Sequence, residues 1–235
     1  MTQFQPLSER HRAALSSNPW FAALPEVTRN DILAHAIRRT LAAGERLFSR
    51  GDQSDGVYGV IEGCIRVSGT NRSGRETVLD FYGPGSWIGE VSTLEGAPRI
   101  HDADAYGATR VLQVSPEDLE ALLARHPVLC RAVLRLEAQR LRILLTALES
   151  YSTQTLEQRL ANRLLMLAGF HGVQGAEGLR INLHLPQETL AQLIGATRQR
   201  VNGILREWEI EGVIAQRFGH IQIRDRSRLE ALAEL

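Results

Sequence analysis

A helix, a tight turn and a second helix are encoded together near the end of this sequence, and this segment constrains the fold more than any other. Gly195 stands where a short turn needs a residue that tolerates positive φ. Thr197 follows, and its hydroxyl can cap the next helix. Apolar residues recur at helical spacing on both sides of the turn: Leu190, Leu193 and Ile194 before it, and Val201, Ile204, Leu205 and Trp208 after it.

Long polar side chains are left facing outward near the start of the second helix. A helix of this kind can read DNA, because its N-terminal side chains reach base edges in the major groove. After Gly212, two short apolar runs flank Phe218-Gly219, which resembles a β-hairpin wing. The alternative is an ordinary helical hairpin whose arginines are solvated surface. The residues expected to contact DNA are Thr197, Arg198, Gln199, Arg200, Asn202, Arg206 and Arg217.

Charge is distributed unevenly along the 235 residues, although the formal net charge is zero. The sequence contains no lysine, so arginine supplies every permanent side-chain cation. Between residues 197 and 228, seven arginines stand against four acids, which makes this region modestly basic. The length suits one large domain or two small ones.

Cys64 and Cys130 are far apart in sequence and fit no metal-binding spacing. They are interpreted as reduced, small core residues of a cytosolic protein. A cysteine-ligated iron–sulfur cluster needs four thiolates and is excluded within one chain. No apolar stretch has the length of a membrane span, and no signal peptide is evident. We therefore expect a cytoplasmic protein with no metal and no membrane partner.

In the N-terminal half, the sequence pattern changes from helical to β-prone at about residue 38. Residues 1 to 36 are predicted to be helical, with Pro25 starting a helix through Ile32. From there to residue 114, short β-prone runs alternate with glycine, which predicts an antiparallel β-sandwich or roll. The runs include Val57 to Ile61, Cys64 to Val67, Thr77 to Phe81 and Val111 to Val114, with a hairpin tip at Asn71 to Gly74.

A long helix is predicted to begin at Pro127, after a shorter one capped by Ser115 with Pro116 at its first position. The long helix carries an a/d-type apolar seam, while arginines occupy the opposite face. We favour a dimer interface, although the same stripe could pack against the chain's own β-roll. The seam residues are Leu134, Ala138, Leu141, Leu145 and Leu148.

The segment between the long helix and the turn contains further predicted elements. A helix should begin at Gln154 or Thr155 and run through Ala168. Residues 172 to 178 are predicted to be a loop, and residues 179 to 185 alternate like a strand.

This order of elements resembles the CRP/FNR family of bacterial transcription regulators over nearly the whole chain. The sharpest marks are Gly85 to Glu90, the downstream Arg99, and Gly195 to Asn202. The resemblance implies a β-roll that binds a small effector, a long helix that dimerises, and a winged helix that binds promoter DNA. It also implies RNA polymerase as a partner and a palindromic operator.

The effector site follows from the same resemblance. Amides around Gly89 would bind phosphate at a helix start, Glu90 would accept from a ribose hydroxyl, and Arg99 would neutralise a cyclic phosphate. The alternative for Glu90 and Arg99 is a structural ion pair. The expected effector-binding residues are Gly89, Glu90, Val91, Arg99, Ile100, Leu144 and Leu145.

Several positions depart from the family pattern. Ile100 replaces a Ser or Thr of the members that bind cyclic AMP, and Leu144 and Leu145 replace hydroxyls that meet the adenine. No cofactor is assigned with certainty. The candidate effectors are a cyclic-AMP-like nucleotide and a cyclic dinucleotide. Gln199 replaces a common glutamate, and Gly203 stands where a second base-contacting arginine often lies, so a different operator is expected.

The expected fold class is α+β, with a jelly-roll-like antiparallel β-roll, a long dimerisation helix and a C-terminal winged helix-turn-helix. The corresponding domains are residues 1–126, 127–152 and 153–235. The predicted function is a homodimeric DNA-binding transcription regulator controlled by a small effector. An effector-independent regulator and a nucleotide sensor acting through protein contacts are the alternatives. An enzyme is disfavoured, because no complete catalytic motif is present.

Overall fold

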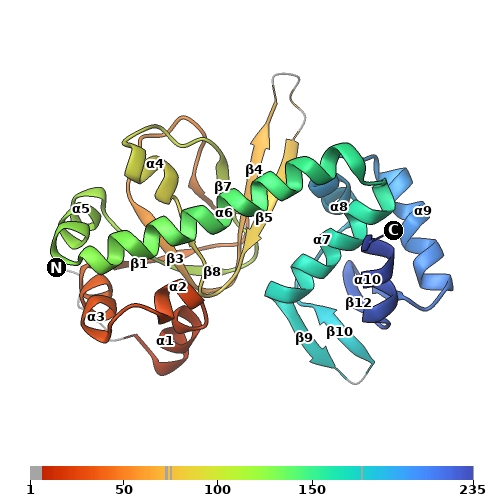
Figure 1. Cartoon of the computed structure of the whole chain (residues 1–235), viewed down its shortest axis with the longest axis horizontal. Helices are drawn as coiled ribbons and strands as arrows, with labels where there is room; N and C mark the ends of the chain where they lie inside the picture. Colours follow the sequence, from red (N-terminus) through yellow and green to blue (C-terminus); the bar gives the residue numbers. More distant parts are fainter. Residues whose placement is uncertain (1–6, 72–73, 75, 176, 235) are drawn as a thin grey trace. The chain divides into compact units, whose positions relative to one another are not determined.

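The computed structural model describes residues 7–71, 74, 76–175 and 177–234. The chain forms two compact units, one built from residues 1–69 with 79–142 and the other from residues 70–78 with 143–235. Figure 1 shows the elements of each unit along the chain. The domain boundaries predicted at residues 126 and 152 remain predictions.

Two four-stranded sheets form the β-roll of the first unit, in the orders β1-β8-β3-β6 and β2-β7-β4-β5. The central pairs are antiparallel, such as β3 with β8 and β4 with β7. This confirms the predicted antiparallel β-roll. The strands are β1 (Ile37–Leu41), β2 (Arg46–Phe48), β3 (Val57–Glu62), β4 (Ile65–Thr70), β5 (Glu76–Tyr82), β6 (Trp87–Ile88), β7 (Asp102–Ala105) and β8 (Thr109–Val114).

Short helices cover one sheet of the roll and begin at local signals in the sequence. Ser115 caps α5 by accepting from the amide of Asp118, with Pro116 at the first helical position, as predicted. Pro25 precedes α3 as predicted, but the helix continues beyond Ile32. The helices are α1 (Glu9–Ser16), α2 (Pro19–Ala22), α3 (Glu26–His35), α4 (Glu90–Glu95) and α5 (Pro116–Arg125).

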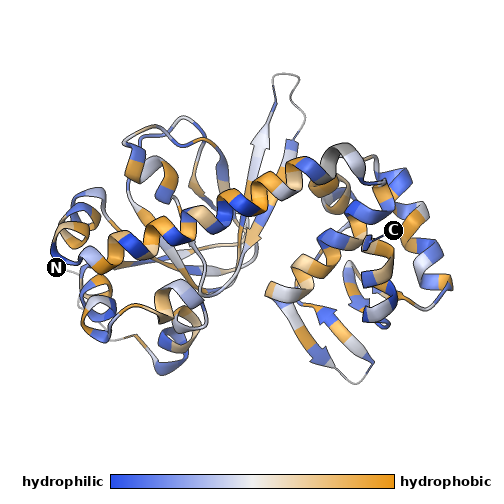
Figure 2. Cartoon of the chain, viewed as in Figure 1, coloured by the Kyte–Doolittle hydropathy of each residue, from blue (hydrophilic) through white to orange (hydrophobic). Residues whose placement is uncertain are grey.

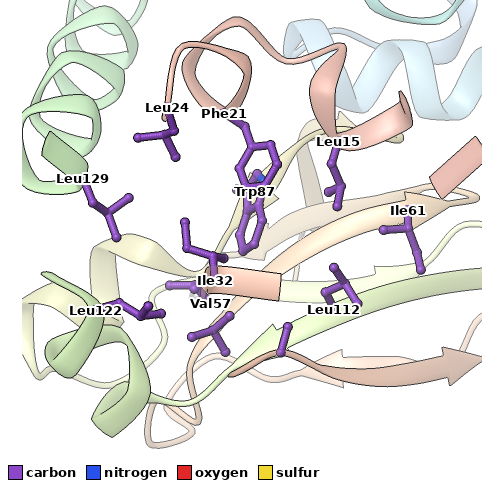
Figure 3. Close-up of a cluster of buried hydrophobic side chains, with 12 residues drawn as sticks. Leu15, Phe21, Leu24, Ile32, Val57, Ile61, Trp87, Leu112, Leu122 and Leu129 are labelled. Atoms are coloured by element: carbon purple, nitrogen blue, oxygen red, sulfur yellow. The ribbon is translucent and has the colours of Figure 1, made fainter. Parts of the chain in front are cut away.

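An aromatic cluster joins these helices to the sheet (Figure 3). Phe21 of α2 stacks on Trp87 of β6 with ring centroids 5.7 Å apart. Leu15, Ile32 and Leu122 extend this cluster toward α1, α3 and α5, and each is at most 4% exposed. Burying such side chains contributes about 1.5–3 kcal/mol each. The apolar packing fixes β6 and therefore the start of α4, which follows it directly.

The helix α6 (Pro127–Thr153) is 27 residues long and begins in the first unit. The five predicted seam residues are all exposed on it in the single chain, with Leu134 at 69% and Leu148 at 70%. Orange bands of apolar residues recur along α6 in Figure 2. Within the first unit, Leu134, Ala138 and Leu141 are exposed, so this part of the stripe does not pack against the chain's own roll.

The second unit combines helices with a four-stranded sheet in the order β11-β12-β10-β9. Thr155 caps α7 in a capping box with Gln158, which settles where that helix begins. The elements are α7 (Leu156–His171), β9 (Gly172–Gly175), β10 (Gly178–Ile181), α8 (Gln187–Ile194), α9 (Arg198–Ile210), β11 (Ile214–Arg217), β12 (His220–Ile223) and α10 (Arg226–Glu234).

Two sequence predictions in this unit need correction. Residues 172 to 178 were predicted as a loop, but residues 172–175 form β9 and pair with β10. The strand predicted to run to Leu185 ends at Ile181, although Leu183 and Leu185 are buried. The alternation of buried and exposed residues therefore continues to Leu185, beyond the last residue that pairs in the sheet. The predicted hairpin tip at residues 71 to 74 lies partly outside the described residues, and among the described helices none has the length and apolarity to cross a membrane.

Candidate effector cradle and DNA-reading helix

The start of α4 is shaped by Gly89, which has a φ of 87° in the left-handed region. A Cβ atom at this position would lie 2.7 Å from Nη1 of Arg99, so a side chain would displace the guanidinium. Only glycine allows both the backbone conformation and this close approach. The sequence Gly89-Glu90 thus places a helix start and a carboxylate directly beside Arg99.

Arg99 is held in one orientation by several contacts. Its side chain is 1% exposed. Nη1 donates to the carbonyl of Gly89 at 2.8 Å, and Nη2 donates to the carbonyl of Gly56 at 2.6 Å and to Oδ1 of Asp55 at 2.8 Å. The guanidinium also lies 4.3 Å from the ring centroid of Phe48, a cation–π contact. The guanidinium is therefore held in place by contacts within the protein itself.

Asp55 provides the counter-charge for Arg99. Its carboxylate also accepts from the hydroxyl of Tyr58 at 2.5 Å and from Nε2 of Gln113 at 3.2 Å. Burial alone would raise the pKa of Asp55, but the hydrogen bonds from Tyr58 and Arg99 outweigh it and lower the pKa. Burial, together with the neighbouring Asp55 carboxylate, raises the pKa of Tyr58. Asp55 consequently stays ionised and Tyr58 stays a donor.

Glu90 pairs with an arginine that the sequence reasoning had given no role. Its Oε1 accepts from Nη1 of Arg140 on α6, while Nη2 of Arg140 donates to the carbonyl of Trp87 at 2.6 Å. Glu137 lies one turn earlier, 3.6 Å from Arg140. Burial and the nearby Glu90 raise the pKa of Glu137. The structure thus brings two carboxylates around a single guanidinium.

We call Asp55, Gly89, Glu90, Arg99 and Arg140 the effector cradle. Glu90 and Arg99 each form an ion pair, as the structural alternative expects, but their partners are Arg140 and Asp55 and they do not pair with each other. Two atoms of the cradle are buried without a hydrogen-bond partner among the described residues, namely Nε of Arg99 and Oε2 of Glu90. One is a donor and the other an acceptor, so a ligand with both functions can satisfy them.

The other predicted effector residues are less enclosed. Val91 and Ile100 follow Glu90 and Arg99 in sequence and are 43% and 49% exposed. Leu144 and Leu145 lie further along α6 and are 67% and 53% exposed. Their part in an effector site stays a prediction.

Asp55, Glu137 and Arg140 were missed as functional candidates. Arg140 could have been found, because it occupies the face of α6 opposite the leucine seam, which is the face left to meet the roll. Asp55 carried no comparable signal in the sequence. Within the described residues, no group of three or more His, Cys, Asp or Glu side chains is arranged to hold a metal ion.

The predicted helix-turn-helix is confirmed as a local structure. Gly195 ends α8 with a φ of 67°, and the hydroxyl of Thr197 accepts from the amide of Arg200 to cap α9. The predicted inward residues Val201, Ile204, Leu205 and Trp208 are all buried. Burial of this stripe against α8 and β11 leaves the opposite face of α9 accessible.

The side chains predicted to contact DNA fall into two groups. Those of Arg198, Gln199, Arg200 and Arg206 are exposed on α9, and Arg217 is exposed at the end of β11. Asn202 is half-buried, and its Oδ1 accepts from Nε2 of Gln187 at 2.9 Å, which links α9 to α8. The arginines and Gln199 are free to approach a groove, whereas Asn202 is already engaged within the motif.

Two family profiles match this chain. Residues 38–126 match the cyclic nucleotide-binding domain, and residues 158–232 match the Crp-like helix-turn-helix domain. The first range contains Asp55, Gly89, Glu90 and Arg99, and the second contains the whole of α8, α9 and the wing. A β-roll and a helix-turn-helix of these two kinds define a DNA-binding transcription regulator controlled by an effector.

Similar proteins agree with these matches. The chain is 31% identical to the CRP-like cAMP-activated global transcriptional regulator of Mycobacterium tuberculosis, over 79% of this chain and 83% of that protein. It is 30% identical to the cyclic AMP receptor protein of Thermus thermophilus, over 93% and 98% of the two chains. The chain belongs to the CRP/FNR family of transcription regulators.

Solved structures share the fold. The catabolite activator protein of Thermus thermophilus matches with a TM-score of 0.54 and 29% identity, over 92% of this chain and 99% of that one. FixK2 from Bradyrhizobium japonicum matches with a TM-score of 0.74 at 23% identity, over 84% and 96%. The second likeness concerns the fold alone.

Proposed function

We propose that this protein is a homodimeric regulator whose effector cradle binds a phosphate-bearing cyclic nucleotide, and that the bound dimer recognises a palindromic operator. The observation that carries the effector assignment is the pair of unpartnered buried atoms, Nε of Arg99 and Oε2 of Glu90. A buried polar atom left without a partner costs about 1–3 kcal/mol. A ligand that offers an anionic oxygen and a hydroxyl removes both costs.

The remaining contacts of the cradle support this assignment. Arg99 cannot swing to find another partner, because two carbonyls, Asp55 and the Phe48 ring hold it. A guanidinium oriented in advance loses less conformational entropy when it binds a phosphate. The N-terminus of α4 adds backbone amides next to Gly89, where negative charge is favoured. Glu90 would accept from the sugar hydroxyl while Arg140 neutralises it.

The choice of nucleotide is constrained by the hydroxyl groups that the other predicted effector-binding residues lack. Ile100 cannot donate to a phosphate, and Leu144 and Leu145 cannot donate to a base. A lost neutral hydrogen bond costs about 1 kcal/mol and a charge-assisted one about 1.5–3. We therefore expect cyclic AMP to bind weakly, with another base or a cyclic dinucleotide as the competing ligands. The named relatives are described as cAMP-activated and as a cyclic AMP receptor, which supports a cyclic mononucleotide first.

Dimerisation is supported by the exposed seam of α6. Five apolar side chains at a/d spacing would face water in a monomer, and pairing two such helices buries them. A dimer also presents two copies of α9 to half-sites one helical turn apart, about 34–36 Å. Because the chain belongs to the CRP/FNR family of transcription regulators, we also propose a cytoplasmic location and contact with RNA polymerase.

Thermal melts with added ligand test the effector assignment. A ligand at a hundredfold excess over its Kd stabilises the folded state by about 2.7 kcal/mol. Cyclic AMP, cyclic GMP and cyclic di-GMP should be compared on the wild type, on Arg99→Ala and on Glu95→Gln, an exposed acid at the other end of α4. We expect a ligand-dependent rise in Tm for the wild type and Glu95→Gln, and none for Arg99→Ala. An equal rise in all three proteins would place the ligand elsewhere, and no rise in any would favour an effector-independent regulator.

A further inference from the structure

The tip of the wing holds an aromatic residue in an unfavourable backbone conformation. Phe218 has a φ of 48°, and within the described ranges it is the only non-glycine residue with positive φ. Its side chain is also 96% exposed, more than any other large apolar side chain described. A bulky residue in the left-handed region is an outlier that often marks a functional site. Neither the strain nor the exposure of the ring helps the fold.

The strain is imposed by the hairpin itself. Arg217 pairs with His220, so only Phe218 and Gly219 form the loop, and both have positive φ. Such a loop is a type I′ turn, for which Asn-Gly is strongly preferred. Gly219 is held in place by the segment before α8, because its carbonyl accepts a hydrogen bond from the amide of Leu185 at 2.5 Å. A Cβ atom on Gly219 would lie 2.4 Å from Nε2 of His184. The turn therefore cannot relax easily, and Asn at position 218 would suit it better.

A hollow of about 400 Å³ lies between the wing and the beginning of α9. Its lining includes Arg198 at the start of α9, His220 on the wing and Gln187 at the start of α8, together with one carboxylate, that of Glu188. The rings of His184 and His220 meet there with centroids 5.9 Å apart. Arginine, imidazole and helix amides are the groups that bind a sugar–phosphate strand.

The position of this hollow determines which groove the wing tip reaches. A sugar–phosphate strand separates the major groove from the minor groove. If α9 reads the major groove and the strand occupies the hollow, the wing lies across that strand, over the minor groove. Arg217 precedes Phe218 and is exposed, so in this arrangement a cation would lie beside the ring, which a narrow minor groove favours.

We propose that Phe218 is a DNA-contacting residue that packs its ring into the minor groove beside each operator half-site and senses a deformable base step there. The proposal rests on the DNA-binding function of the family and adds a specificity determinant outside α9. Apolar wedges such as Phe unstack base steps in the minor groove, and pyrimidine–purine steps yield most easily. The residue is thus kept for binding at the expense of the turn.

The test uses Phe218→Asn in the full chain, with Phe170→Ala as the control. Phe170 is a second exposed aromatic residue in the same unit, 78% exposed, and it lies near the end of α7 and not in the wing. Operators are first selected by the wild type from random duplexes. Kd is then measured for operators with a TA, CA or GC step at the flanking position, at several salt concentrations, and Tm is measured without DNA.

We expect Phe218→Asn to melt a few degrees above the wild type, because the turn is relieved. Its Kd for the selected operator should rise on the order of tenfold, its preference for a flexible flanking step should disappear, and its salt slope should stay unchanged because no phosphate contact is lost. Phe170→Ala should keep wild-type DNA binding.

Unchanged operator affinity and unchanged step preference in Phe218→Asn would overturn the proposal. So would intact DNA binding combined with lost transcription, because the ring would then serve a protein partner. If the wild type selects no duplex at all, the DNA-binding function itself fails and the proposal fails with it. If the wild type selects operators but Phe218→Asn binds them unchanged, only the proposal for Phe218 fails and the DNA-binding function stands.

Discussion

Arg99 and Arg198 show how differently one residue type can be used within a chain. The side chain of Arg99 is 1% exposed and is held by Asp55 and two carbonyls. Arg198 is exposed at the first turn of α9. A buried guanidinium is oriented before its ligand binds and is poorly screened by salt, whereas an exposed one is ordered only on binding and is screened. Under the proposed function, the buried Arg99 would give the effector cradle selectivity, and the exposed arginines of α9 would give the DNA-reading face a salt-sensitive attraction.

The largest expected effect on DNA binding by the exposed arginines comes from changing the α6 seam, because the dimer is expected to present both copies of α9. Leu141→Glu combined with Leu148→Glu should give monomers, because like charges would meet where leucines are expected to pair. Loss of the second half-site contact should weaken operator binding about a hundredfold or more. Light scattering measures the mass and a gel shift the affinity. Ile143→Glu, an exposed residue outside the seam, is the control, and an unchanged dimer in the double variant would place the interface elsewhere.

The exposed arginines of α9 should contribute differently to DNA binding, some to base discrimination and others to affinity for any sequence. Arg198→Ala should cost about 1–3 kcal/mol of discrimination between operator and random DNA, because a bidentate contact to a guanine edge is lost. Arg206→Ala should weaken all sequences alike and reduce the salt slope by about one. Arg10→Ala, exposed on α1, should do neither. Full operator preference in Arg198→Ala would show that this helix does not read the bases as assigned.

The buried side is tested by Asp55→Asn. The lowered pKa of Asp55 means that its charge stabilises the fold above the unfolded value of about 3.9, and that this contribution is lost as the pH falls through the lowered pKa. At pH 7 we expect a loss of about 1 kcal/mol, modest because the carboxylate is 46% exposed. Urea unfolding at several pH values measures it. The difference from the wild type should shrink in acid. It should change only modestly with salt, because Arg99 is buried although Asp55 is partly exposed, and a strong salt dependence would contradict the picture of a pair anchored by a buried guanidinium.

Glu137→Gln should have the smallest effect and the opposite pH dependence. Because the pKa of Glu137 is raised, its contribution is fully present below its unfolded pKa and is lost as the pH rises through the folded value. The Gln variant should therefore gain stability relative to the wild type as the pH rises, by under about 1 kcal/mol. The same urea series detects this. A gain that did not depend on pH would show that Glu137 does not share its surroundings with Glu90 as the structure indicates.

The sequence by itself determined the elements that depend on neighbouring residues. Gly195 and Thr197 specified the turn and the cap of α9, Ser115 and Pro116 specified the start of α5, and the seven-residue spacing from Leu134 to Leu148 specified the exposed stripe of α6. Caps, turns and periodicity act over three to seven residues, so they can be recognised in a single sequence.

Only the tertiary structure decided which charged groups meet. Asp55 reaches Arg99 across 44 residues, and Arg140 reaches Glu90 across 50. Such pairs depend on how sheets and helices pack, and no local pattern records the partner. The same holds for β9 and for Phe218, whose pairing and strain arise because the flanking strands close on them. The family pattern located Glu90 and Arg99, and the packing of distant elements determined what holds each of them in place.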